Sequence, residues 1–312
     1  MKVIFMGTPD FALPALQALP TGGCLVAAVV TRSDKPGGRG KKLRPSPVKT
    51  YALQEGLTVL QPENLYEPEF VRRLEEIKPD AVVVAAYGRL LPPWLLALPR
   101  FGCLNVHASL LPKYRGAAPI HRAVLNGEKE TGVTIMQMDA GLDTGDIILQ
   151  ERTPIGADDT AGNVHDRLAE LGGKLLIDAL ALVAAGRAKP IKQDDAQSSY
   201  ARPLTGADEI IDWTSDALAI KNQVRGLHPW PVARTTVGGK LLKIWRVDIQ
   251  DSEIKACHKP GQVLETVAGR GVAVQAGRGL VVLREVQLEG KKRLPVEEFL
   301  KGHPIAPGTE LV

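Results

Sequence analysis

Three polar residues stand in apolar or glycine-rich surroundings where their side chains could take part in chemistry. Asn105 and His107 lie two residues apart in the apolar run 103–108, which predicts a strand on which both side chains share one face. Both are near the carboxyl end of that strand, the edge at which open α/β sheets bind ligands. Asp143 lies in the turn 140–145, whose glycines let the backbone fold tightly and direct a side chain inward.

An amide, an imidazole and a carboxylate suit the transfer of an acyl group to an amine. The Asn and His N–H groups could stabilise the oxyanion of a tetrahedral intermediate. The Asp could orient the His and favour its protonated form. It could also assist proton transfer from the attacking nitrogen to the leaving nitrogen. No nucleophilic Ser or Cys is needed because the amine itself attacks, and the sequence has no Gly-x-Ser-x-Gly motif. Spacing alone leaves a second interpretation open, in which the His is a core residue and the Asp only forms the turn.

Short apolar segments alternate with helical ones over the first half of the chain. The predicted strands are 2–6, 24–31, 80–86, 103–108, 131–139 and 146–152, and the predicted helices are 12–19, 68–77, 93–98 and 164–185. The first four strands are apolar on both alternating faces, as the buried strands of a parallel sheet are. The fold class is therefore α/β, with a doubly wound, parallel-type sheet.

The pattern changes after residue 189. A polar stretch without clear periodicity predicts a linker at 190–206. Short strands punctuated by glycine follow at 238–248, 261–267, 271–275 and 280–288. We therefore expect an α/β domain at 1–189, which holds the candidate site, and a C-terminal β-barrel at 207–312 similar to an oligonucleotide-binding fold.

Positive charge is concentrated in one segment. The chain has 39 Lys and Arg against 35 Asp and Glu, a formal net charge of +4. Between Arg32 and Lys49 there are seven basic residues and one acidic residue, Asp34, so this segment alone has a net charge of +6. Its three glycines predict a flexible loop. One interpretation is a solvated surface loop, and the other is a contact with a polyanion.

Several other kinds of site are disfavoured. Cys24, Cys103 and Cys257 form no Cys-x-x-Cys pair, so neither a disulfide framework nor a zinc cage is predicted, and a reducing cytoplasm is favoured. Cys257 and His258 are adjacent, but no second cluster completes a metal site. No Gly-x-Gly-x-x-Gly motif follows Gly7, which disfavours a nicotinamide cofactor. No apolar run reaches the about 18 residues that a membrane span needs.

Two runs resemble the signature segments of the folate-dependent formyltransferase family. The run 105–116 reads NVHASLLPKYRG, and the run 138–145 reads MDAGLDTG. The resemblance implies that Asn105, His107 and Asp143 are catalytic and that 10-formyltetrahydrofolate is the formyl donor. It assigns folate binding to Ser109, Leu110, Leu111 and Pro112. It also implies that the pteridine ring lies near 87–91 and 139–143.

Further segments resemble the branch of this family that modifies a tRNA. They are 7–12 (GTPDFA) and 34–42 (DKPGGRGKK), and the second is similar to a tRNA-contacting loop, which implies RNA contacts by Arg39, Lys41 and Lys42. The resemblance covers nearly the whole chain and is looser in the C-terminal domain. It implies formyl transfer to the α-amine of methionine on initiator tRNA, by a cytoplasmic, monomeric enzyme with no metal and no membrane attachment.

Two alternatives remain open. The same chemistry could serve a sugar-nucleotide or glycinamide-ribotide amine. A glycinamide-type enzyme would end near the first domain, and a sugar-nucleotide enzyme has less use for the basic segment. The other alternative is a non-catalytic RNA-binding module, which would have no need of Asn105, His107 and Asp143.

Overall fold

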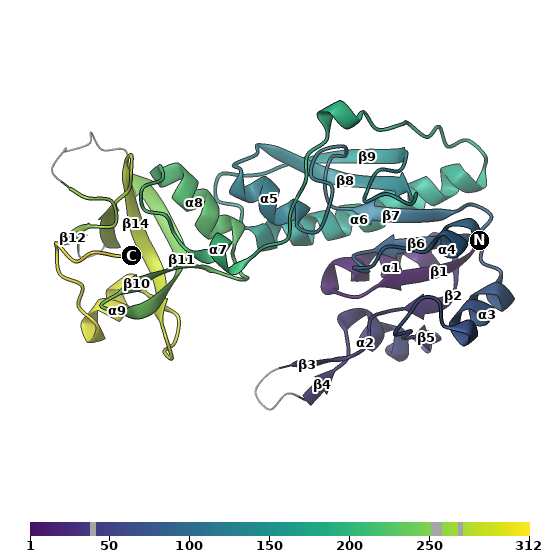
Figure 1. Cartoon of the computed structure of the whole chain (residues 1–312), viewed down its shortest axis with the longest axis horizontal. Helices are drawn as coiled ribbons and strands as arrows, with labels where there is room; N and C mark the ends of the chain where they lie inside the picture. The colour runs from purple at the N-terminus through teal and green to yellow at the C-terminus, as the bar shows by residue number, and fades with distance from the viewer. Residues whose placement is uncertain (38–41, 251–257, 268–270) are drawn as a thin grey trace. The chain divides into compact units, whose positions relative to one another are not determined.

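The computed structural model describes residues 1–37, 42–250, 258–267 and 271–312, and the chain divides into two compact units (Figure 1). The first unit comprises Met1–Pro119, Glu130–Pro154 and His165–Arg202. The second comprises Ile120–Lys129, Ile155–Val164 and Pro203–Val312. The segment predicted as a linker is therefore shared, with 190–202 in the first unit and 203–206 in the second.

A seven-stranded sheet forms the centre of the first unit. In pairing order its strands are β5 (Val59–Leu60), β2 (Leu25–Val30), β1 (Lys2–Gly7), β6 (Ala81–Ala85), β7 (Cys103–His107), β8 (Glu130–Gln137) and β9 (Ile147–Pro154). The pairs from β5 to β7 are parallel, whereas β8 and β9 are added antiparallel. The strand order runs outward from β1 in both directions, so the predicted doubly wound sheet is confirmed.

Helices cover both faces of this sheet. They are η1 (Asp10–Ala12), α1 (Leu13–Thr21), α2 (Pro47–Gln54), α3 (Pro68–Ile77), α4 (Pro93–Ala97) and most of α6 (Ala161–Ala184). The short helix η2 (Asp195–Gln197) also belongs to this unit but has no buried residue. On one face, Leu74 of α3 and Leu95 of α4 join Val82 of β6 in an apolar core. Because the strands are covered on both sides, they are apolar throughout, which is what made them recognisable in the sequence.

Helix α6 packs closely on the opposite face. A Cβ atom on Gly172 would lie 2.7 Å from a methyl carbon of Val106 in β7, and one on Gly173 would lie 2.8 Å from the main-chain oxygen of Pro14 in α1. These two glycines therefore let the helix approach both the sheet and its neighbouring helix. The contact with Val106 supports β7 from behind, directly beside the candidate site residues.

The second unit is built on an antiparallel sheet. Its strands, in pairing order, are β10 (Ala233–Val237), β11 (Lys240–Gln250), β14 (Leu280–Leu288), β13 (Gly271–Gln275) and β12 (Val263–Val267), and β15 (Leu294–Pro295) pairs with β14. The accompanying helices are α5 (Pro119–Leu125), α7 (Gly206–Glu209), α8 (Ala217–Gly226) and α9 (Val296–Gly302). The sheet curls around a core that includes Trp213, Leu242 and Leu283 (Figure 1). The four glycine-punctuated strands predicted here are confirmed, whereas β10 and the helices were not predicted.

Residues 308–312 join the two edges of this curled sheet. At one edge, Thr236 of β10 and Val312 exchange main-chain hydrogen bonds of 2.7 and 3.2 Å. At the other edge, Val263 of β12 donates to the oxygen of Thr309 at 2.8 Å and accepts from Gly308 at 2.7 Å. These bonds satisfy main-chain groups that an open edge would expose, and they complete the barrel-like form.

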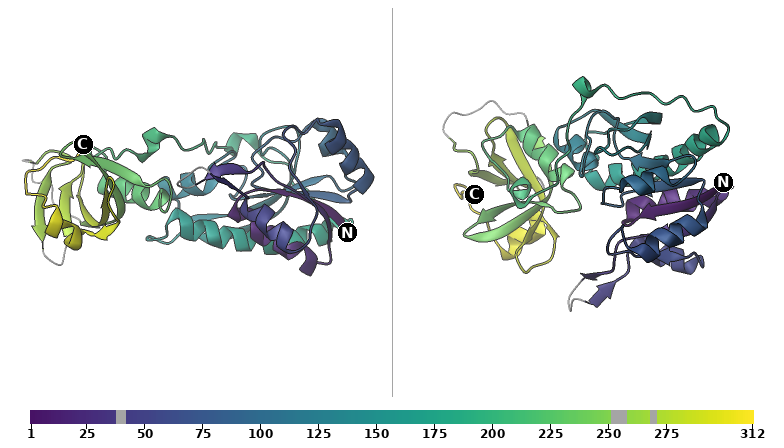
Figure 2. Two further views of the ribbon diagram at one scale, coloured as in Figure 1. Left: turned by 90° about the horizontal axis from the view of Figure 1, so that it is seen from below. Right: turned by 45° about the vertical axis from the view of Figure 1, so that its right-hand side comes forward.

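The basic segment forms a hairpin. β3 (Lys35–Gly37) and β4 (Lys42–Arg44) pair antiparallel, and the hairpin projects from the first unit in Figure 1 and in the right-hand view of Figure 2. At its base, Nζ of Lys49 lies 2.7 Å from the carboxylate of Asp34. Within the described part of 32–49, residues 35–37 and 42–44 form this paired ribbon and α2 begins at Pro47, whereas two of the three glycines on which the predicted flexibility rests, Gly38 and Gly40, lie outside the described residues. Arg39 and Lys41 lie outside the described residues, and only the backbone of Lys42 is described.

Candidate active site

β7 presents Asn105 and His107 on one face, as predicted. Both residues are buried, with 9% and 6% of their surface exposed. β7 lies between β6 and β8, and its residue pairs are Asn105 with Met136 and His107 with Thr134 of β8. The alternation of a strand therefore explains why these two polar side chains point together into the structure.

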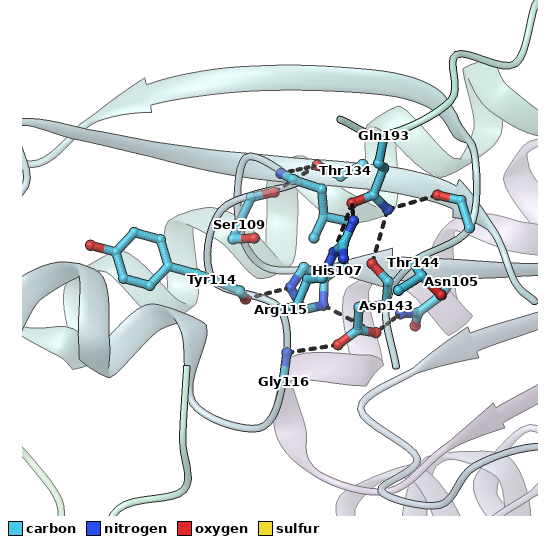
Figure 3. Close-up of polar contacts among 12 residues, drawn as sticks. Asn105, His107, Ser109, Tyr114, Arg115, Gly116, Thr134, Asp143, Thr144 and Gln193 are labelled. Atoms are coloured by element: carbon cyan, nitrogen blue, oxygen red, sulfur yellow. Dashed lines mark hydrogen bonds and ion pairs between the residues drawn. The ribbon is translucent and has the colours of Figure 1, made fainter. Parts of the chain in front are cut away.

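Asp143 reaches this face from the turn that follows β8 (Figure 3). Its Oδ1 lies 3.5 Å from Nδ2 of Asn105 and 3.7 Å from Nδ1 of His107, and its Oδ2 accepts a 2.8 Å hydrogen bond from the main-chain N–H of Gly116. The structure thus brings together the three residues that the sequence nominated. Their catalytic roles remain a prediction.

The turn that carries Asp143 is tightly built. Asp139 accepts hydrogen bonds from the N–H of Gly141 at 3.0 Å and from the hydroxyl of Thr144 at 2.7 Å. A Cβ atom on Gly145 would lie 1.7 Å from the main-chain oxygen of Gln137, so only glycine fits there. Asp143 itself has a φ of +55°, in the left-handed region that few non-glycine residues adopt.

The main chain of the loop that follows β7 sets the tautomer of His107. Its Nε2 lies 3.0 Å from the carbonyl oxygen of Tyr114. A carbonyl oxygen only accepts, so Nε2 carries the proton and donates. In the neutral ring Nδ1 then bears a lone pair, and its contact with Asp143 becomes attractive only when Nδ1 is also protonated. Nδ1 is therefore the ring nitrogen that faces the Asp143 carboxylate.

Two residues that the sequence analysis gave no role lie beside this cluster. Gln193 donates from Nε2 to the main-chain oxygens of Asp143 and Gly145 and accepts from the guanidinium of Arg115 (Figure 3). Arg115 stood in the run that resembles the family signature. Gln193 stood in the segment predicted as a linker, where no spacing or motif distinguished it.

The segment nominated for folate binding is held by Thr134. The hydroxyl of Thr134 donates to the oxygen of Ser109 at 2.7 Å and accepts from the N–H of Leu111 at 3.2 Å. The Ser109 side chain is fully buried and donates to the oxygen of Lys113 at 2.7 Å. The Ser109 hydroxyl is thus engaged in shaping the loop that follows β7. Folate contacts at 109–112 would therefore use the main chain, Leu110 and Pro112.

Thiol and metal chemistry find no support among the described residues. Burial raises the pKa of the Cys103 thiol to about 12 and also raises the pKa of Cys24, so neither is a ready thiolate at neutral pH. Cys257 lies outside the described residues. Within the described ranges, no group of three His, Cys, Asp or Glu side chains is placed to hold a metal ion. None of the helices formed by these residues is long and apolar enough to cross a membrane.

A polar cavity of about 670 Å³ lies in the second unit. Its charged and aromatic lining consists of Lys221, Arg225, Arg246, Arg284, Arg293, His228 and Trp245, together with Asp158, Asp248 and Glu297. The guanidinium of Arg293 lies 4.3 Å from the centre of the Trp245 ring. Burial lowers the pKa of His228, so the cationic character comes from the Arg and Lys side chains. Lys221, Arg284 and Arg293 form ion pairs with Asp158, Asp248 and Glu285, so much of this positive charge is already balanced by neighbouring carboxylates.

Solved structures share this architecture. A sugar 3N-formyl transferase, whose structure was determined in the presence of dTDP and 5-N-formyl-THF, matches 94% of this chain and 99% of its own, with a TM-score of 0.66 and 21% identity. A glycinamide ribonucleotide transformylase from Symbiobacterium toebii matches 62% of this chain and 94% of its own, with a TM-score of 0.51 and 24% identity. At these identities the likeness concerns the fold alone.

Sequence relatives match from end to end. Methionyl-tRNA formyltransferase of Pelotomaculum thermopropionicum is 52% identical over 312 residues, which cover 100% of this chain and 98% of the relative. That of Moorella thermoacetica is 51% identical and covers 100% of this chain and 99% of its own. A family model described as formyl transferase matches residues 1–180, and one described as the formyl transferase C-terminal domain matches 203–304. With its site geometry and both matched regions, this chain belongs to the formyl transferase family.

Proposed function

We propose that this protein transfers the formyl group of 10-formyltetrahydrofolate to the α-amine of methionine on initiator tRNA. The observation that carries the chemistry is that Asn105 and His107 both lie within 3.7 Å of one carboxylate oxygen of Asp143. The relatives named methionyl-tRNA formyltransferase, at about half identity over the whole chain, support the choice of acceptor.

The reaction forms one C–N bond and breaks another. The amine nitrogen attacks the formyl carbon, and the tetrahedral intermediate then loses the folate N10 as its leaving group. The Nδ2 donor of Asn105 and a protonated Nδ1 of His107 stabilise the oxyanion. Asp143 stabilises the imidazolium and relays the proton that the attacking nitrogen loses and N10 gains. The donor is a co-substrate, and no metal ion enters this scheme.

We further propose two surfaces for the tRNA. One is the basic hairpin segment 32–49, through Arg39, Lys41 and Lys42, because the segment has a net charge of +6 and its described strands β3 and β4 project from the unit that contains the site. The other is the arginine-rich cavity of the second unit, where Trp245 and guanidinium groups suit phosphate and base contacts. We propose that the enzyme acts as a monomer in the cytoplasm, without membrane attachment.

The direct test is formyl transfer by the purified protein. Charged initiator tRNA should gain one formyl group that is acid-stable on the methionine nitrogen, and the reaction should require 10-formyltetrahydrofolate. A nucleotide-linked amino sugar and glycinamide ribotide serve as competing acceptors. Preferential formylation of either competing acceptor would refute the proposed acceptor. No transfer to any amine would refute the proposed chemistry.

A further inference from the structure

We propose that Gln193 is a positioning residue, which fixes the turn carrying Asp143 at the distance from Asn105 and His107 that formyl transfer requires. The inference rests on the proposed function, in which Asp143 is catalytic. Gln193 is 50 residues from Asp143 in the chain and only 6% exposed. It comes from the segment that the sequence identified only as a linker.

All hydrogen-bonding positions of the Gln193 amide are used. Nε2 donates to the main-chain oxygen of Asp143 at 2.9 Å and to that of Gly145 at 2.7 Å. Oε1 accepts from Nε of Arg115 at 3.0 Å and from Nη2 of Arg115 at 2.8 Å. A primary amide has two N–H donors and two lone pairs on its oxygen, so these four bonds saturate it. A buried polar group with four ordered partners cannot move without breaking several bonds at once.

These partners select glutamine in one orientation. The guanidinium of Arg115 only donates and the two main-chain oxygens only accept. A flipped amide would therefore place its N–H groups against those of Arg115 and its oxygen against the two main-chain oxygens. A glutamate at position 193 would keep the contact with Arg115 but could not donate to the oxygens of Asp143 and Gly145. A methionine would occupy a similar volume and make none of the four bonds.

The turn needs this support because of the backbone of Asp143. Its φ of +55° is a strained conformation for a residue with a side chain, and such conformations persist only where the surroundings hold them. Gln193 bonds the oxygen of this residue and that of Gly145 two residues on. Loss of both bonds releases the strained peptide toward negative φ, and that rotation withdraws the carboxylate from its contact with Gly116.

Arg115, which bonds the Gln193 side chain, is itself held firmly in place. Arg115 is only 3% exposed, and its Nη2 also donates to the carboxylate of Asp195 at 2.8 Å. Its main-chain N–H donates to the oxygen of Ser199 at 2.8 Å, and its main-chain oxygen accepts from Ala201 at 2.7 Å. Arg115 is therefore anchored, through both its side chain and its main chain, by the segment to which Gln193 belongs.

The same segment also supports His107. The main-chain N–H of Tyr114 donates to the hydroxyl oxygen of Ser199 at 2.9 Å, and the carbonyl of Tyr114 holds Nε2 of His107. Gln193 thus holds the backbone of the turn that carries Asp143, and Ser199 holds the loop whose Tyr114 carbonyl orients His107. The segment between the two regions matched by the family models is part of the active-site scaffold.

The experiment uses the full chain with Gln193→Met and Gln193→Glu. Gln197 provides a matched control, because it lies four residues on, is exposed, and donates from its side-chain amide to the carboxylate of Asp194 at 2.8 Å, away from the turn. We expect kcat on charged initiator tRNA to fall on the order of 10²-fold in both Gln193 variants, as for a reacting group displaced by about 1 Å. The KM for tRNA should change less than about twofold, and Gln197→Met and Gln197→Glu should match the wild type.

A double-mutant cycle with Asp143→Asn separates positioning from general stability. If Gln193 acts through Asp143, adding Gln193→Met to Asp143→Asn should lower kcat little further, because the positioned group is already absent. Full additivity of the two changes would overturn the proposal. So would wild-type kcat in either Gln193 variant, or an equal loss in the Gln197 controls.

A second measurement does not depend on activity. In amide hydrogen exchange, the N–H of Gly116, which donates to Oδ2 of Asp143, should lose protection in Gln193→Met and keep it in Gln197→Met. Unchanged protection of Gly116 in a folded Gln193→Met protein refutes the positioning role. If the wild type fails to formylate tRNA while Gly116 responds as expected, the proposed acceptor is wrong and the positioning role stands.

Discussion

Nδ1 of His107 faces Oδ1 of Asp143 at 3.7 Å, a separation longer than a hydrogen bond but within the range of an ion pair. The other ring nitrogen is already committed to the carbonyl of Tyr114. The imidazole is therefore held in one orientation, with Nδ1 as the nitrogen that faces the carboxylate. This relationship leads to the first prediction.

His107→Ala and Asp143→Ala should each lower kcat about 10²–10⁴-fold, the usual contribution of a proton-transferring group. Asn105→Ala should cost about 10²–10³-fold, as the loss of an oxyanion donor does. Single-turnover formylation of charged tRNA measures each effect, and circular dichroism checks the fold. Turnover near that of the wild type in any one variant would remove that residue from the mechanism.

The basic hairpin should affect RNA binding and leave the donor site intact. Arg39→Ala, and more strongly its combination with Lys41→Ala and Lys42→Ala, should raise the KM for tRNA. Removal of one cation that neutralises a phosphate should make the slope of log affinity against log salt shallower by about 0.9. Kinetics at two salt concentrations, with folate affinity measured separately, test this. Unchanged tRNA kinetics would identify a solvated surface hairpin, and collapse of folate binding would show that the hairpin shapes the active site.

The Arg122–Asp208 pair should stabilise the second unit in a pH-dependent way. Nη1 and Nη2 of Arg122 lie 2.7 and 3.0 Å from the two carboxylate oxygens of Asp208, and this guanidinium holds the pKa of Asp208 well below its usual range. A folded-state pKa that is depressed contributes stability above the unfolded pKa of about 4, and that stability is lost as the pH falls below it.

We therefore expect Asp208→Asn to lower the free energy of unfolding at pH 7 by about 1.5–3 kcal/mol, typical of a hydrogen bond to a charged group. The difference from the wild type should shrink as the pH falls through about 4 toward about 3. Denaturant titrations at both pH values measure it. The exposed pair Asp216–Arg278 is a matched control, and Asp216→Asn should cost less than about 1 kcal/mol at pH 7. A pH-independent loss in Asp208→Asn would point to packing instead.

Cys103 should resist alkylation in the native protein. Its thiol is fully buried, donates to the oxygen of Leu95 at 3.4 Å, and has a pKa raised to about 12 by burial. At pH 8 the thiolate that reacts with iodoacetamide is therefore scarce and shielded. Mass spectrometry of tryptic peptides should find Cys103 modified only after denaturation. Rapid native modification would mean that β7 opens far more often than its burial implies.

Local patterns predicted most of the first unit because its strands are apolar and its helices begin clearly. The predicted helix 68–77 matches α3 at both ends, since proline favours the first turn of a helix. The meeting of Asn105 with His107 followed from strand alternation, and that of both with Asp143 from the family resemblance. Gln193 could not be predicted, because its importance depends on partners 50 and 78 residues away in the chain. The β3–β4 pairing was hidden by the glycines in the same segment.

The way residues 308–312 join the sheet edges has a consequence for synthesis on the ribosome. Thr236 in β10 precedes its partner Val312 by 76 residues, so both edges of the curled sheet stay uncovered until the last of these residues leaves the exit tunnel. Domains generally fold in order of emergence, and exposed strand edges invite pairing with other chains. The nascent second unit is therefore vulnerable to association with neighbouring chains until residues 308–312 have emerged, whereas the first unit already has its complete sheet by then.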